Sequence, residues 1–123
     1  MEKQIDLVQY GRDIMTYKDL PAQLDDINLK LAGWYAYYSA QIIPLELAEA
    51  RFWEDHKDYK ADKPKSDSYV KALWRLTVDG QKMIEYERVL KTLEKLMSSL
   101  RSSLARHDRE LRTTYAQKQF DKN

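Results

Sequence analysis

Large apolar side chains recur along most of this chain at alternating intervals of three and four residues, a spacing that places them on one face of an α-helix. In the first half the main series has a period of seven: Leu24, Leu31, Tyr38, Leu45, Phe52 and Tyr59. Such a heptad repeat is typical of helices that pack in coiled-coil fashion. We therefore predict a long helix over residues 20–60. Because the repeat stays in phase on both sides of Pro44, we expect a kink there rather than a helix end.

A second repeat occupies the second half of the chain. One heptad position holds Met83, Leu90, Met97, Leu104 and Leu111, and the other holds Tyr86, Leu93, Leu100 and His107. This pattern predicts a helix over 69–118, which Asp79-Gly80 interrupts and can bend. Residues 61–68 are polar, contain Pro64 and end in Ser and Asp side chains that suit the start of a helix. We predict the turn between the two long helices there.

The first residues predict a short helix over 2–17. A new helix start follows at Asp19-Leu20-Pro21, since Asp can cap a helix and Pro is tolerated in its first turn. We therefore expect one all-α domain, in which two long amphipathic helices form an antiparallel, coiled-coil-like hairpin. Its parts are an N-terminal helix or arm (1–17), a first long helix (20–60), a turn (61–68) and a second long helix (69–118).

A hairpin of two helices buries only one seam, and several apolar residues of this chain, such as Ile42 and Ile43, lie off that seam. Left in water they would form a larger apolar patch than monomers usually show, so we expect an oligomer, with the N-terminal helix as an exchanged arm. The residues expected in the seams are Leu24, Leu31, Trp34, Tyr38, Leu45, Phe52, Met83, Leu90, Leu93, Met97, Leu100, Leu104, His107 and Leu111.

Composition narrows the class of protein. The chain has 123 residues, 33% of them charged, and no cysteine, which excludes disulfides, a thiol nucleophile and cysteine-bound zinc. It contains no apolar run long enough to span a membrane, and its first residues lack the order of a signal peptide, so we expect a cytoplasmic protein. The net charge of +1 is uneven, at −5 for residues 1–55 and +6 for residues 56–123. This asymmetry is either chance variation on solvated helices or a basic half that meets an anion or an acidic neighbour.

Candidate chemistry is sparse. His56 stands among acidic residues but lacks a ligand three or four positions away, so we expect no metal site. His107 falls in a seam position, where it either pairs across a helix interface or acts as a pH-sensitive assembly switch. The serines near residue 100 have no base within sequence reach, and no phosphate-binding loop or carboxylate pair occurs. We expect no enzyme activity and no cofactor.

The predicted turn and the residues around it mix cations with aromatic side chains. Cations neutralise phosphates, and aromatic rings offer bases a stacking surface of low sequence preference. The candidate nucleic-acid-binding residues are Lys57, Tyr59, Lys60, Lys63, Lys65, Tyr69, Lys71 and Arg75. Interleaved acidic residues also fit a merely solvated hairpin tip. A second basic set follows at Arg101, Arg106, Arg109 and Arg112, where cations also complement the dipole of the last helix.

Other features form a recognisable layout. They are the helix start at Asp19-Leu20, Trp34 fourteen residues after that leucine, Glu49, Asp58-Tyr59 closing the long helix, a Ser66-Asp67 opening after the turn, and Leu90, Leu93, Leu96 and Leu100 leading to a basic tail. In this plan the chain resembles the phage recombination mediator proteins of the UvsY type over nearly its whole length. The family's Lys-x-Arg before its Asp-Tyr is Glu54-Asp55-His56 here, so DNA binding at that spot does not carry over.

The resemblance implies a ring-like homo-oligomer that binds single-stranded DNA. Such mediators help a recombinase to displace a single-strand-binding protein and form its filament, which for a phage protein takes place in the cytoplasm of the host cell. The alternative is a structural or assembly coiled-coil protein that binds only protein partners. Neither interpretation involves a membrane.

Overall fold

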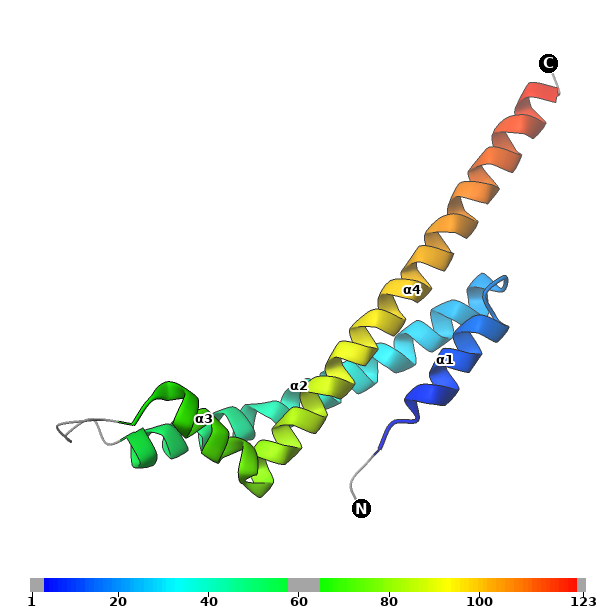
Figure 1. Ribbon diagram of the computed structural model, residues 1–123. Coiled ribbons are helices and arrows are strands. Elements are labelled where there is room, and N and C mark those ends of the chain that lie inside the picture. The colour runs from blue at the N-terminus through cyan, green and yellow to red at the C-terminus, as the bar shows by residue number, and fades with distance from the viewer. Residues whose placement is uncertain (1–3, 58–64, 122–123) are drawn as a thin grey trace. The chain divides into compact units, whose positions relative to one another are not determined.

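The computed structural model describes residues 4–57 and 65–121, and over these residues the chain is all-helical (Figure 1). The described part has four helices: α1 (Leu7–Thr16), α2 (Pro21–Lys57), α3 (Asp67–Leu76) and α4 (Val78–Asp121). The predicted all-α class is confirmed, and the two long helices, α2 and α4, pack together.

The short first helix begins later than predicted. Asp6 caps α1, because its carboxylate accepts a hydrogen bond from the backbone N–H of Gln9 at 3.0 Å. This side-chain bond satisfies a free N–H at the helix start and fixes the first helical residue. Ile14 is the buried residue of α1, whereas Val8 is exposed.

The second helix starts at Pro21, one residue after the predicted start, and is described to Lys57, passing through Pro44. The prediction that Pro44 would not end the helix is confirmed. The predicted cap differs: the carbonyl of Leu20 accepts the first hydrogen bonds, from the N–H groups of Gln23 and Leu24. The carboxylate of Asp19 instead pairs with the guanidinium of Arg106 at 3.4 Å.

The predicted single helix over 69–118 is wrong, because it is divided at Thr77. The backbone of Thr77 is extended, with φ −76° and ψ 159°. Its hydroxyl donates to the carbonyl of Trp74 at 2.6 Å and accepts from the N–H of Gly80 at 2.9 Å, so one side chain closes α3 and caps α4. A Cβ on Gly80 would lie 1.9 Å from the carbonyl oxygen of Trp74. Glycine therefore permits the close approach that the sharp junction needs.

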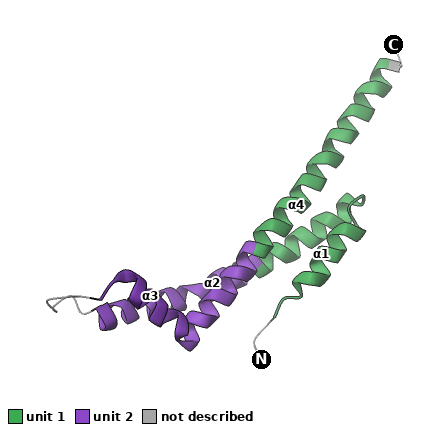
Figure 2. Cartoon of the chain, in the orientation of Figure 1, with its two compact units in different colours: residues 1–34, 92–123 green, residues 35–91 purple. Residues whose placement is uncertain are grey.

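The chain divides into two compact units (Figure 2): unit 1 consists of residues 1–34 and 92–123, and unit 2 of residues 35–91. In unit 1, α1 packs on its own chain. The indole N–H of Trp34 donates to the hydroxyl of Tyr10 at 3.2 Å, and a Cβ on Gly11 would lie 3.9 Å from Leu96. In the single chain, α1 therefore docks within its own molecule, and its exchange between subunits stays a prediction.

Unit 2 has its own core, built from α2, α3 and α4. Leu45, Trp74 and Met83 are buried together, with Phe52 and Tyr86 packed against them. The ring centroids of Phe52 and Trp74 lie 5.5 Å apart. Aromatic pairs at this separation add to the free energy gained from apolar burial. Trp74 thereby holds α3 to both long helices.

The predicted seam turns out to be largely the core of the single chain. Its buried members are Leu24, Leu31, Tyr38, Leu45, Met83, Leu93 and Leu100. The half-buried members are Trp34, Phe52, Leu90, Met97, Leu104 and His107. Leu111 is 67% exposed. Side chains that the chain already covers offer no contact area to another subunit, so an oligomer would need a different surface.

Candidate nucleic-acid interface

The candidate interface is the exposed side of α3. Ser66 caps this helix by accepting a hydrogen bond from the N–H of Tyr69 at 3.2 Å. Val70 and Trp74, four residues apart, are buried and fix the rotation of the helix on the core of unit 2. Leu73 is half-buried, and Lys71 and Arg75 are both exposed.

Tyr69 and Lys65 form a cation–aromatic pair at the start of α3. The ammonium of Lys65 lies 5.1 Å from the centroid of the Tyr69 ring. Tyr69 is 48% exposed. A ring that binds a cation on one face keeps its other face for stacking. Lys71 and Arg75, four residues apart on the same helix, share a face of α3 and are both exposed.

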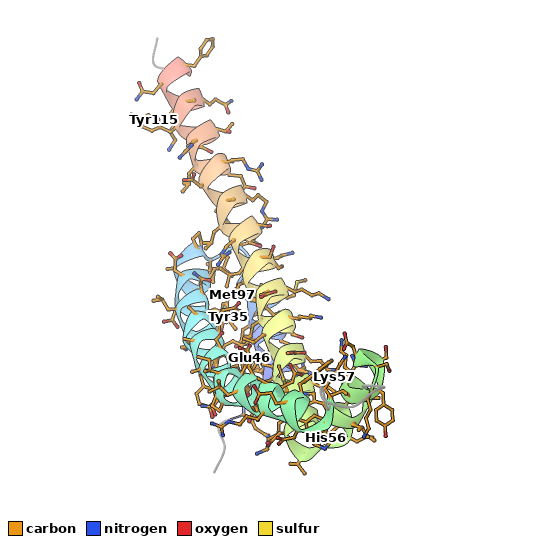
Figure 3. The ribbon with its side chains drawn as sticks, turned by 90° about the vertical axis from the view of Figure 1, so that its left-hand side faces the viewer. Tyr35, Glu46, His56, Lys57, Met97 and Tyr115 are labelled. Atoms are coloured by element: carbon orange, nitrogen blue, oxygen red, sulfur yellow. The ribbon has the colours of Figure 1, made fainter. Side chains whose placement is uncertain are left out.

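Lys57 was predicted to bind phosphate, but it has a partner in its own chain. Its ammonium pairs with the carboxylate of Asp67 and lies 5.6 Å from the ring centroid of Trp53. Figure 3 shows Lys57 and His56 on the last turns of α2. Because its charge is already balanced and its side chain is only 15% exposed, Lys57 contributes little to an anion site. The sequence indicated Asp67 only as a helix-capping residue and gave no signal for this pairing.

Three of the predicted residues, Tyr59, Lys60 and Lys63, lie outside the described residues. Within the described range, the candidate interface therefore consists of Lys65, Tyr69, Lys71 and Arg75. We call these four residues the α3 surface.

The arginines of α4 are partly engaged with carboxylates. Arg106 lies 3.4 Å from Asp19 and 3.9 Å from Glu110, and Arg112 lies 3.2 Å from Asp108. Residues 108–120 are all exposed, and Figure 1 shows the end of α4 (orange to red) continuing past the connection between α1 and α2. Exposed pairs of this kind hold little energy and compete weakly with a phosphate. They nevertheless reduce the charge that this set presents.

The two histidines have structural contacts. His56 stacks on Phe52 with ring centroids 3.8 Å apart. The Nε2 of His107 lies 2.7 Å from the carbonyl of Lys18, to which it donates a hydrogen bond. Its Nδ1 lies 3.9 Å from a carboxylate oxygen of Glu110. His107 thus joins α4 to the connection between α1 and α2.

Residues 4–57 and 65–121 hold no cluster of three or more His, Cys, Asp or Glu side chains placed to bind a metal ion. None of the helices described is both long enough and apolar enough to cross a membrane. Comparisons of the chain with protein-family models, curated protein sequences and solved structures found no significant match.

Proposed function

We propose that this chain is a non-enzymatic, self-associating protein that binds single-stranded DNA and assists recombination by helping a recombinase to displace a single-strand-binding protein. The role in recombination rests on the resemblance to mediators of the UvsY type. DNA binding rests on the chemistry of the α3 surface.

The observation that carries the proposal is the exposed Tyr69 ring beneath the ammonium of Lys65, at 5.1 Å. In a single-stranded site, aromatic rings stack on bases while cations track the phosphates. Lys71 and Arg75, one turn apart on the same helix, add two exposed cations. The nearby carboxylate of Asp67 is balanced by Lys57, which leaves a net positive surface.

Contacts in unit 2 support an antiparallel hairpin. Tyr38 packs on Tyr86 with ring centroids 5.5 Å apart, while Leu45, further along α2, packs with Met83, which is earlier in α4. Partners whose numbers change in opposite directions are expected of two antiparallel helices. Copies of such a hairpin in one assembly would place more than one α3 surface along a strand of DNA and combine weak contacts into avidity.

The test is fluorescence anisotropy with a labelled oligonucleotide. Changing Lys65, Lys71 and Arg75 together to Glu should abolish binding or weaken it strongly, because attraction to phosphate becomes repulsion. For the unaltered protein, each neutralised phosphate should add about −0.7 to the slope of log affinity against log salt. In partially weakened single variants, such as Lys71→Gln, the slope should become shallower.

The matched control places the same charge change on α4, with Lys91, Lys95 and Lys118 changed to Glu. All three are exposed. Affinity close to that of the unaltered protein is expected for the control. Equal losses in both triple variants would show that only net charge matters, and no binding by the unaltered protein at low salt would exclude the DNA-binding function.

A specific observation favours the second candidate, an assembly protein that binds only proteins. Ile43 and Leu47 are each 59% exposed on α2. Aliphatic side chains gathered on an exposed helix face commonly mark contacts with protein. This candidate predicts self-association without any binding of DNA.

A further inference from the structure

A second apolar stripe lies on the outer side of α2 in unit 2. Tyr38, Ile42 and Leu45 of this helix are buried in the core of the unit. The exposed positions between them follow a heptad repeat of their own, with steps of four and three: Ala36, Ala40, Ile43, Leu47 and Ala50. All five are apolar and all five are exposed. Charged residues make up 33% of this protein. A helix face exposed only to solvent would therefore be expected to carry some of them, yet none of these five heptad positions is charged.

The side chains of this stripe suit contact with another helix. Alanine at two successive positions, Ala36 and Ala40, allows a second backbone to approach closely, and Ile43 and Leu47 supply knobs for the holes of a partner helix. By sequence spacing alone, the next earlier position in α2 is Gly33. A Cβ there would meet nothing within 4 Å, so the chain itself does not require glycine at that position. Glycine within a helix is nonetheless unfavourable by about 1 kcal/mol relative to alanine.

Charges beside the stripe select the partner and its direction. Glu46 precedes Leu47, Arg51 follows Ala50, and both are exposed. In a parallel coiled coil in register, the residue before one core position faces the residue five places later on the other helix. Glu46 and Arg51 are five places apart and of opposite charge. Two copies of α2 would therefore form this pair twice.

The same relation recurs earlier in α2, where Asp25 precedes Lys30 by five residues, although the ammonium of Lys30 also lies 3.2 Å from the carboxylate of Asp26 in its own chain. At the flanking positions between these two pairs the side chains are uncharged: Ala32, Tyr37, Ser39 and Pro44. An antiparallel pair centred between Ala40 and Ile43 would instead bring Lys30 of one copy near Arg51 of the other. The pattern of charges thus fits a parallel partner with the sequence of this chain.

We propose that a second copy of this chain docks on the outer face of α2, parallel and in register, through Ala36, Ala40, Ile43, Leu47 and Ala50. This inference rests on the self-association in the proposed function and assigns it a surface. Figure 3 labels Glu46, which marks the edge of this face on α2. The surface differs from the buried seam, and it leaves the α3 surface available to DNA.

Cysteine cross-linking tests the geometry directly, because the chain contains no cysteine of its own. In a parallel pair in register, Ala40 of one copy faces Ala40 of the other, within the Cα separation of about 4.4–6.8 Å that a disulfide needs. Ala40→Cys should therefore form a covalent dimer under mild oxidation at micromolar concentration. Gln41→Cys, one residue along and also exposed, is the matched control and should remain monomeric on a non-reducing gel.

A charge exchange tests the pairing without touching the apolar stripe. Glu46→Arg should weaken dimerisation about tenfold, because each of two attractive pairs becomes repulsive. Glu46→Arg with Arg51→Glu restores opposite charges and should restore dimerisation. Analytical ultracentrifugation gives the dissociation constants, and circular dichroism checks that the helical signal is unchanged.

Each outcome supports or overturns a specific part of the proposal, either the parallel face on α2 or self-association itself. Cross-linking of Ala40→Cys with rescue by the double charge exchange supports the parallel face. Cross-linking only in a mixture of Ala40→Cys and Ile43→Cys would mean an antiparallel pair and overturn it. Larger assemblies without either cross-link would overturn this face but retain self-association. A monomer at every concentration, with DNA binding intact, would overturn the inference and self-association while leaving the DNA-binding function.

Discussion

Unit 2 contains two places where the sequence opposes a continuous helix, Pro44 in α2 and the Thr77–Gly80 segment between α3 and α4. At Pro44 the helix continues. The missing N–H leaves the carbonyl of Ala40 without its usual partner, but Ala40 and Pro44 are both exposed, so water can satisfy that oxygen. Burial of Ile42 and Leu45 on either side requires the same helical phase and keeps the helix intact.

At Thr77 the helix ends although no proline is present. The hydroxyl of Thr77 replaces helical partners at the junction, because it donates to the carbonyl of Trp74 and accepts from the N–H of Gly80. The side-chain amide of Gln81 also donates to the carbonyl of Arg75. Because Gly80 has no Cβ, the carbonyl oxygen of Trp74 can occupy a position that would overlap a Cβ at residue 80. The comparison shows that the helix ends where the residues around the local defect offer the backbone other partners, and continues where they do not.

Gly80→Ala gives the largest expected effect. The new Cβ would overlap the carbonyl of Trp74, at 1.9 Å. Overpacking usually costs about 1–3 kcal/mol, and we expect the upper end because a backbone atom cannot rotate away. Gly33→Ala is the matched control: with nothing within 4 Å of its Cβ, it should stabilise the helix by about 1 kcal/mol. Urea unfolding measures both, and stabilisation by both would mean that the junction opens readily.

Pro44→Ala should have an intermediate effect of opposite sign. Proline in a helix interior is unfavourable by about 3 kcal/mol relative to alanine, and about 1 kcal/mol of that is offset by its restriction of the unfolded chain. We expect a stabilisation of about 2 kcal/mol in urea unfolding. Pro21→Ala, at the first position of the same helix, should be nearly neutral. A loss of stability in Pro44→Ala would show that the geometry imposed by proline is needed.

Thr77→Ala should have the smallest effect, a destabilisation of about 1 kcal/mol from loss of the helix cap. Thr77→Ser retains the hydroxyl and should keep most of the stability. Thermal unfolding followed by circular dichroism distinguishes the two variants. Equal stability of the alanine and serine proteins would mean that Gly80 alone determines the break.

Periodicity was sufficient to predict the helical class, the continuation of α2 through Pro44 and most of the core. The heptad positions that were identified, such as Leu31 and Leu93, are fully buried, because helical phase is a local property of sequence. The break at Thr77 was missed because its cause is the approach of the Trp74 carbonyl to Gly80. Asp79-Gly80 was noticed as an interruption, but its consequence depends on the position of a residue in another helix.

The candidate site was only partly predictable for a similar reason. Cations could be counted from sequence, yet whether each was available depended on its neighbours in space, as the pairing of Lys57 with Asp67 illustrates. The outer stripe of α2 was seen only as apolar residues away from the seam. Three of the five residues in its repeat are alanines, including Ala36 and Ala40. Alanine is common on exposed helix faces, so a heptad repeat of alanines does not by itself indicate a contact surface.

The division at Thr77 also makes α3 dependent on the rest of unit 2. With ten residues, α3 is shorter than the roughly 12–15 residues that an isolated helix needs in water, and it receives no helical hydrogen bonds continued from α4. Its formation is therefore a cooperative event, coupled to burial of Val70 and Trp74. Tyr69 and Lys71 are presented together when that burial occurs and are dispersed when it is lost. Conditions that loosen the core would remove the α3 surface as a whole.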